Sequence, residues 1–104
     1  MIANTPKPPY YAVIFSSLRT EKDEGYEEMA ELMMNLAAQQ SGFLGVESVR
    51  DGLGITISYW QDLRAIQQWK QNSEHQIAQR KGRADWYKQY KVRIAKIERD
   101  YEFL

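Results

Sequence analysis

Apolar residues occupy both sides of the first regular stretch of the chain, from Tyr10 to Leu18. With the two-residue period of a strand, the two sides are Val13, Phe15 and Ser17 against Ala12, Ile14 and Leu18. A strand that is apolar on both sides is typical of a sheet covered on both faces. Residues 1–9 hold all three prolines and are predicted to form a flexible arm. Residues 10–104 are predicted to form one domain.

The spacing of apolar residues then changes from two to three and four, which predicts a helix. Thr20 and Asp23 are close to a capping box, so the helix is expected to begin at Thr20. Gly42 is expected to end it. The apolar positions that recur at helical spacing are Tyr26, Met29, Ala30, Met33, Leu36 and Ala37.

Two further strands are predicted from Phe43 to Arg50 and from Gly54 to Trp60. The dipeptide Asp51-Gly52 between them is a strong signal for a hairpin turn. The hairpin therefore places these two strands side by side and antiparallel.

Two short helices are expected after the hairpin. Asp62 can cap the first, from Leu63 to about Gln71. Ser73 begins a second capping-box pattern, which predicts a break and a new helix from about Glu74 to Tyr87, with Gly82 inside it.

The last strand is predicted from Tyr90 to Tyr101, with a bulge near Ile94 where the apolar positions change parity. The element order is β-α-β-β-α-α-β, which indicates an α+β fold of the ferredoxin-like, split βαβ type. Four antiparallel strands would carry helices on one face only. The other apolar face then needs cover, and a second copy of the sheet is the simplest, so a homodimer is expected.

Composition excludes several classes of partner and site. The chain has 14 basic and 14 acidic residues and a net charge of zero, which favours neither a nucleic-acid nor a membrane partner. It has no cysteine and one histidine, so thiolate chemistry, disulfides and multi-histidine metal sites are excluded and no metal is expected. Residues 1–9 lack the apolar core of a signal peptide, and a cytoplasmic protein is the expectation.

Several segments resemble the antibiotic biosynthesis monooxygenase family, whose members are dimeric α+β barrels with an internal pocket. The resemblance covers roughly Tyr10 to Phe103. Its densest parts are Gly42–Glu47, Ser58–Trp60, Ala65–Lys70, Glu74-His75 and Gly82–Tyr87.

The resemblance implies a pocket between the sheet and the helices. In this family the first strand and the tryptophan-bearing helices line it. The implied substrate-binding residues are Phe15, Ser16, Tyr59, Trp69, Arg83, Trp86 and Tyr87. His75 is the candidate catalytic base, because it alone titrates near neutral pH without perturbation.

Each candidate also has a structural alternative. Trp69 and the other aromatic residues can simply be core or interface residues. Trp86 and Tyr87 are adjacent and cannot both face one way on a helix, so one is expected to pack on the sheet and the other to line a pocket or interface. Arg83 can lie solvated at the surface, and His75 can cap or pack in the first turn of its helix.

Three functions are compatible with the resemblance. One is a monooxygenase that oxidises an aromatic phenol or hydroquinone without metal, flavin or other cofactor. A second is a non-catalytic, ligand-binding or stress-associated dimer of the same fold, with a small aromatic molecule as candidate ligand. A third is haem binding or degradation, but the haem-ligand position falls at Gln79, and the family's strand-one asparagine falls near Ser16.

Overall fold

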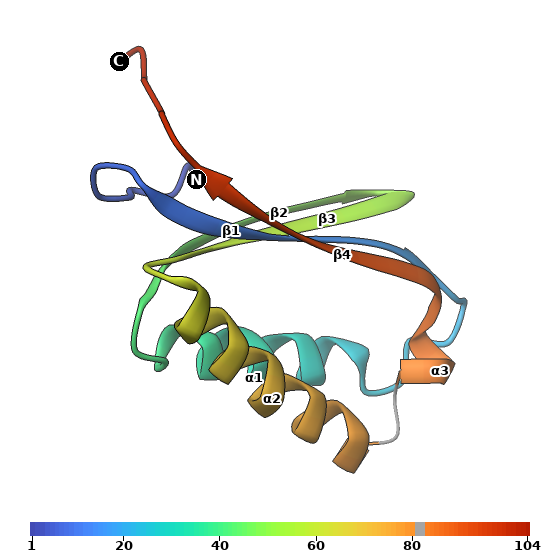
Figure 1. The fold of residues 1–104 in the computed structure, drawn as a ribbon. Helices are drawn as coiled ribbons and strands as arrows, with labels where there is room; N and C mark the ends of the chain where they lie inside the picture. Colours follow the sequence, from blue (N-terminus) through green and yellow to red (C-terminus); the bar gives the residue numbers. More distant parts are fainter. Residues whose placement is uncertain (81–82) are drawn as a thin grey trace.

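The computed structural model describes residues 1–80 and 83–104, with side chains described except at 76–80 and 83–84. The elements are β1 (Tyr10–Arg19), α1 (Tyr26–Ala38), β2 (Phe43–Asp51), β3 (Leu53–Trp60), α2 (Leu63–Arg80), α3 (Arg83–Trp86) and β4 (Tyr87–Ile97). The strands form one antiparallel sheet in the order β2-β3-β1-β4. Both long helices lie on one face of the sheet, as Figure 1 shows. The ferredoxin-like α+β fold is therefore confirmed.

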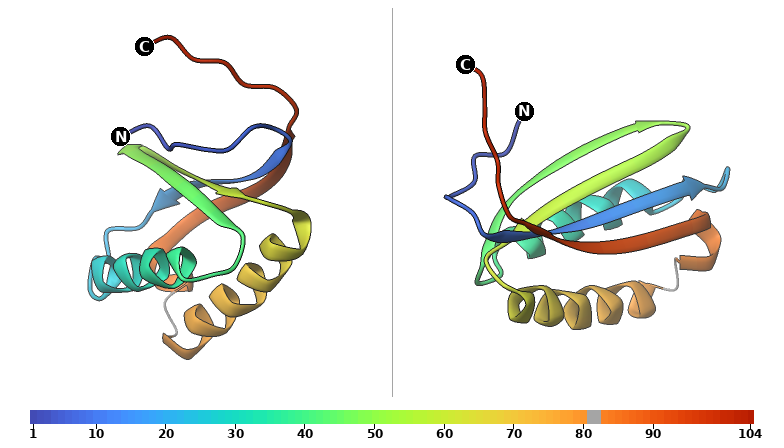
Figure 2. Two further views of the ribbon diagram at one scale, coloured as in Figure 1. Left: turned by 90° about the vertical axis from the view of Figure 1, so that its left-hand side faces the viewer. Right: turned by 45° about the horizontal axis from the view of Figure 1, so that its top comes forward.

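The sheet has two distinct faces. The inner face, toward the helices, carries Tyr11, Val13, Phe15 and Ser17 of β1, because Tyr11 and Val13 pack against the core around Trp60. The outer face carries the alternate residues of β1. Figures 1 and 2 show that both chain termini lie on the outer side.

The first helix begins later than the sequence predicts. Thr20 does not cap it, because its N–H donates to Trp86 O at 2.9 Å and its hydroxyl donates to Asp85 O. These bonds tie the end of β1 to α3. The helix begins at Tyr26 instead, after Gly25 in the left-handed region at φ 79°. It ends at Ala38, and Gly42 follows within the turn to β2.

The predicted break at Ser73 is wrong. The Ser73 hydroxyl donates backward to Lys70 O at 3.0 Å, so it caps no new helix. One continuous helix, α2, runs from Leu63 to Arg80. The predicted cap at Asp62 is confirmed, since its Oδ1 accepts from Ala65 N at 2.8 Å. Gly82 lies outside the described residues.

The bulge predicted near Ile94 is also wrong. Ile94 pairs regularly with Val13, and the register shifts only between Leu18 and Arg19, whose partners are Gln89 and Tyr87. The irregularity therefore lies at the start of β4, where the chain leaves α3. The strand begins three residues earlier than expected, at Tyr87, and ends at Ile97.

We expect Gly42→Ala to destabilise the fold by about 2 kcal/mol or more. Gly42 has φ 88°, and a Cβ there would lie 2.7 Å from the Cβ of buried Ala65. The matched control is Gly52→Ala, because Gly52 has φ 77° with nothing within 4 Å of an added Cβ. The control carries only the backbone cost of about 1 kcal/mol. Urea denaturation of both variants measures the difference, and equal losses would contradict the steric argument.

Candidate functional site

Among the described residues, α1 and α2 pass over the inner face of the sheet, so side chains on this face can enclose a ligand. Residues directly opposite one another in a sheet share a face. Ile94 pairs with Val13, and Val92 pairs with Phe15, so both β4 residues belong to the inner face.

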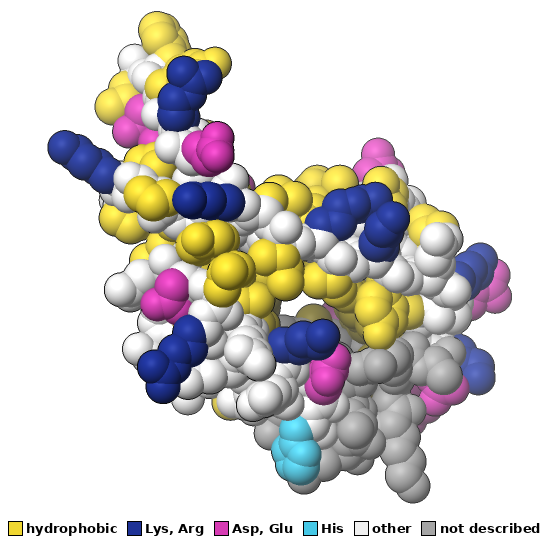
Figure 3. Space-filling model, in the orientation of Figure 1, with side chains coloured by type: hydrophobic (Ala, Val, Ile, Leu, Met, Phe, Trp, Pro, Cys, Tyr) yellow, Lys and Arg dark blue, Asp and Glu magenta, His cyan; other side chains and the backbone are white. Residues whose placement is uncertain are grey.

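Those two β4 residues are nevertheless open to solvent. Val92 is 48% exposed and Ile94 is 53% exposed, although both point to the helix side. Figure 3 shows a hollow with apolar side chains above and beside it and a basic side chain along its lower edge. The helices thus stand off the β4 side of the sheet and leave an apolar opening.

Stacked tryptophans lie at one end of the inner face. Trp60 at the end of β3 is fully buried, and Trp69 of α2 stacks on it with ring centroids 6.0 Å apart and planes at 23°. Phe43 meets Trp60 edge-on at 5.4 Å. The indole N–H of Trp60 donates to Ser58 Oγ at 2.8 Å. This end is flat, aromatic and hydrogen-bonded.

A second aromatic cluster forms the opposite end. Tyr87 lies edge-on to Phe15 at 5.6 Å and to Tyr26 of α1 at 6.0 Å. Tyr90 lies 5.4 Å from Phe15 and 5.7 Å from Tyr87. Burial, followed by a hydrogen bond with Tyr26, raises the pKa of Tyr87 well above its usual value. Its hydroxyl is therefore neutral at physiological pH and able to donate a hydrogen bond.

Trp86 packs next to this cluster. It is 7% exposed, and its indole N–H donates to Glu24 O at 2.9 Å. Its ring lies edge-on to Tyr26 at 5.9 Å. Of the adjacent aromatic pair, Tyr87 is thus the residue that meets Phe15, while Trp86 packs against the loop before α1.

Arg50 adds a charge beside the second cluster, and the sequence analysis did not single it out. Its Nη2 donates to Ser17 Oγ at 2.7 Å, and its Nη1 donates to Ser17 O at 3.3 Å. Arg50 starts on β2 and Ser17 lies on β1, so the side chain crosses β3 at Gly54. The signal in the sequence was a glycine inside a strand, which often marks a close approach.

The structure divides the predicted substrate-binding residues between the two faces. Phe15, Trp69 and Tyr87 lie on the inner side, at the ends of the hollow. Ser16 and Tyr59 lie on the outer face, because Ser16 alternates with Phe15 and Tyr59 alternates with Trp60. These two residues do not meet the others.

Tyr59 instead belongs to a hydrogen-bonded network with Glu47 and the N-terminal arm. Its hydroxyl donates to Glu47 Oε1 at 2.7 Å, and the N–H of Ala3 donates to Glu47 Oε2 at 2.9 Å. The Tyr59 bond, followed by the Ala3 bond, lowers the pKa of Glu47. Burial, followed by the bond to Glu47, raises the pKa of Tyr59 to about 12.

His75 and Trp69 do not converge in this structure. With about 3.6 residues per turn, positions six apart on one continuous helix lie roughly 120° apart around its axis. Trp69 packs against Trp60, whereas His75 is exposed. The helix break that would have brought them together is absent from α2. The side chains of Gln79 and Arg83 lie outside the described residues.

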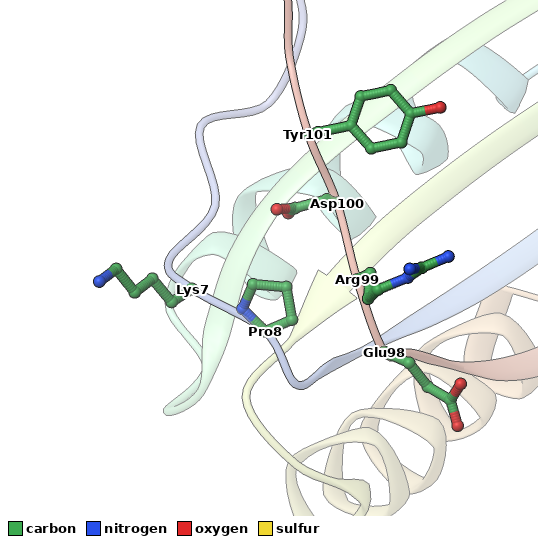
Figure 4. A pocket seen from close by; sticks show the side chains of 6 residues that line it. All are labelled: Lys7, Pro8, Glu98, Arg99, Asp100 and Tyr101. Carbon is green, nitrogen blue, oxygen red and sulfur yellow. The ribbon is translucent and has the colours of Figure 1, made fainter.

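A separate depression lies between the arm and the C-terminal tail. Its lining residues are Lys7, Pro8, Glu98, Arg99, Asp100 and Tyr101. Figure 4 shows that the side chains of Lys7, Arg99 and Glu98 point in different directions rather than toward a common centre. The Asp100 carboxylate already accepts a hydrogen bond from Tyr10. The inner hollow, with its facing aromatic rings, is therefore the better candidate site.

Comparison with known proteins identifies the family. The sequence model of the antibiotic biosynthesis monooxygenases matches residues 9–81. The chain belongs to this family. An uncharacterised protein of Bacillus subtilis (strain 168), YqjZ, is 58% identical over 104 residues, which cover 98% of this chain and 91% of that protein.

Solved structures show the same fold. SnoaB of Streptomyces nogalater, a cofactor-independent oxygenase, has a TM-score of 0.72 at 10% identity, covering 89% of this chain and 97% of its own. PA3566 of Pseudomonas aeruginosa has a TM-score of 0.68 at 19% identity, and the match covers 92% of this chain and 99% of PA3566. At these identities the likeness extends to the fold alone.

Metal ligands and membrane-spanning helices also bear on the class of site. Within residues 1–80 and 83–104, no group of three or more His, Asp or Glu side chains is arranged to hold a metal ion. Over the same residues, no helix is long and apolar enough to cross a membrane.

The Glu47 network should make stability depend on pH on both sides of neutrality. A lowered folded pKa means that Glu47 stabilises the fold above its unfolded pKa, and that this contribution is lost as the pH falls through the folded value. A raised pKa means that Tyr59 contributes fully below its unfolded value, and that this is lost as the pH rises toward about 12.

Urea denaturation of the parent, Glu47→Gln and Tyr59→Phe between about pH 3 and pH 11 measures this dependence. We expect the parent to lose more stability than Glu47→Gln toward acid, and more than Tyr59→Phe toward base. Parallel curves for all three proteins would show that the network does not form.

Proposed function

We propose that this protein is a small-molecule monooxygenase that oxidises an aromatic phenol or hydroquinone with O₂, without metal or flavin. The observation that carries the proposal is the hollow on the inner face of the sheet, which has the Trp60–Trp69 stack at one end of that face and the Phe15–Tyr87 cluster at the other. Family membership and the oxygenase fold neighbour support the same reaction class.

The reaction needs no group beyond the substrate and O₂. The phenol loses its proton, and the electron-rich anion transfers an electron to O₂. Recombination at the para carbon gives a hydroperoxide, which loses water to leave a quinone. One phenol and one O₂ thus give one quinone and one water. The protein has to bind the ring, hold the anionic oxygen and exclude bulk water.

Three inner residues suit these tasks. Trp69 offers a flat wall on which a ring can stack, and Phe15 offers an edge at the other end. The neutral Tyr87 hydroxyl can donate a hydrogen bond to a phenolate oxygen as negative charge develops, in exchange for its bond with Tyr26. We keep Trp69, Phe15 and Tyr87 as the proposed substrate-binding residues.

A non-catalytic ligand-binding dimer is the second candidate. The exposure of His75 favours it, because His75 is the sole histidine of the chain and the pairing with Trp69 does not form. The catalytic role of His75 stays a prediction of the sequence. Oxygen uptake by the parent protein separates the two candidates.

We expect the parent protein to consume O₂ and form quinone, with water and no hydrogen peroxide as the second product, from members of a panel of fused-ring phenols that carry hydrogen at the para carbon. Trp69→Leu should lower kcat/KM about tenfold or more by removing the wall, and Tyr87→Phe should lower kcat by a similar factor with its ring kept in place. Oxygen uptake and quinone absorbance are the measurements, and far-ultraviolet circular dichroism controls for folding.

The panel also decides between the candidates. Unchanged turnover in His75→Gln would remove the imidazole from the mechanism. Binding without oxygen uptake across the panel would overturn the monooxygenase proposal and favour the binding dimer.

We further propose that the protein is a cytoplasmic homodimer whose sheets pack through their outer faces. The middle of that face is apolar, with Ile14 opposite Ile57. Toward the hairpin, Val49 is 66% exposed and Leu53 is 49% exposed, so apolar area is left bare there. A second copy of the face would cover it.

Charge on the outer face is self-complementary. The edge strand β2 carries Glu47 and Asp51, whereas the opposite edge strand β4 carries Lys91 and Arg93. A two-fold pairing that sets β2 against the partner's β4 brings opposite charges together, whereas pairing β4 with β4 brings like charges together. The first arrangement is therefore the one we propose.

Lys91→Glu should raise the dimer dissociation constant about tenfold or more, because it opposes two acidic edges. Adding Asp51→Lys should restore much of the loss. Lys70→Glu on the exposed side of α2 is the control and should have no effect. Sedimentation equilibrium measures all four proteins, and a parent that stays monomeric at micromolar concentration would overturn the dimer.

A further inference from the structure

The guanidinium of Arg50 occupies the space that a side chain at position 54 would fill. A Cβ on Gly54 would lie 2.2 Å from Arg50 Cζ and 2.3 Å from its Nη2, so no other residue at position 54 leaves the guanidinium where it is. Gly54 is itself buried beneath it. The chain thus holds a cation at a fixed place on the inner face of the sheet.

In the described part of the chain, the hydrogen bonds of that cation go to neutral acceptors. Arg50 donates to Ser17 Oγ, Ser17 O and Gly52 O. These bonds use three of the five N–H donors of a guanidinium, which leaves two. Over residues 1–80 and 83–104, no ion pair of Arg50 with a carboxylate is found. Arg19, by contrast, pairs with Asp23 at 3.0 Å.

The Arg50 head lies beside the tyrosine end of the hollow. Ser17, which it grips, pairs directly with Tyr90, and Tyr90 contacts both Phe15 and Tyr87. The positive charge of Arg50 also acts on the Tyr87 hydroxyl, where it opposes the rise in pKa that burial causes. Arg50 and the aromatic cluster are thus within electrostatic reach of each other.

We propose that Arg50, held on Ser17 across Gly54, is the residue that selects an aromatic ligand bearing a carboxylate. The ring of that ligand lies in the hollow near Phe15 and Tyr87, and its carboxylate accepts from the free N–H groups of Arg50. This proposal rests on the hollow of the proposed function as the ligand site, but it does not require turnover.

A carboxylate suits this place for physical reasons. A guanidinium is a planar fork that matches the two oxygens of a carboxylate, and such charged hydrogen bonds are stronger than neutral ones. Arg50 is exposed to solvent, so the cost of removing the ligand charge from water is small. A neutral phenol of the same ring system cannot form these charged hydrogen bonds with Arg50.

The experiment compares two probes that differ in one group, 6-hydroxy-2-naphthoate and 2-naphthol, by isothermal titration calorimetry at pH 7. We expect the parent to bind the acid about tenfold or more tighter than the neutral probe. Arg50→Gln should abolish that preference while leaving 2-naphthol affinity within about twofold. Arg64→Gln, on the exposed surface of α2, is the matched control and should keep the preference.

Gly54→Ala tests the placement of the charge rather than its presence. Its Cβ forces the guanidinium off Ser17 while Arg50 remains, and the backbone of Gly54 is not in the left-handed region. We expect a loss of preference close to that of Arg50→Gln. In the Arg50→Gln background, Gly54→Ala should cause no further loss.

The outcomes separate this inference from the proposed function. Equal binding of the two probes by the parent, binding of neither, or a preference that survives Arg50→Gln would overturn the inference. If Arg50→Gln only lowers the melting temperature, Arg50 is a structural tie between β2 and β1, and the inference is wrong. Acid preference without oxygen uptake would instead overturn the monooxygenase proposal alone.

Discussion

Aromatic contacts hold the helices against the sheet at both ends of its inner face. At one end Trp60 and Trp69 stack beneath the sheet, with Trp60 fully buried. At the other end Trp86 bonds to Glu24 ahead of α1, and Tyr87 meets Tyr26. Large rigid rings act as spacers as well as contacts. The β4 side of the inner face therefore stays uncovered.

The two faces of the sheet follow from a single alternation along β1. Phe15 points to the helices and Ser16 points away, so neighbouring residues serve a ligand site and an outer surface. The polar groups are divided in the same way. Arg50 brings its charge to the inner face, while Glu47, three residues earlier, ties Tyr59 and the N-terminal arm to the outer one.

Sequence periodicity was sufficient for the fold, because alternation and helical spacing depend only on local burial. The four strands follow from it, while the hairpin turn follows from the Asp51-Gly52 dipeptide and the helix cap from Asp62. Local capping signals were less reliable. Thr20 and Ser73 both carry hydroxyls suited to a cap, but their hydrogen bonds go to Asp85 O and Lys70 O. Such competing partners cannot be seen in a short window of sequence.

The site was only partly predictable, because some of its contacts join residues that are far apart in the sequence. Phe15, Trp69 and Tyr87 are aromatic residues on elements whose inner side the pattern fixes, and they are brought to the ends of the hollow. Tyr59 was placed on the wrong face relative to them, because the face of β3 that meets the helices depends on Trp60. Arg50 was missed because its reach across Gly54 involves three strands at once.

The position of the two chain ends has a practical consequence for work with this protein. Ala3 is bonded on the outer face, and the tail from Glu98 to Leu104 leaves the sheet on the same side, as Figure 1 shows. Tyr101, Phe103 and Leu104 are each at least 97% exposed. An affinity tag at either end would therefore be delivered to the surface proposed for self-association. Purification handles should be cleaved before oligomeric state is measured.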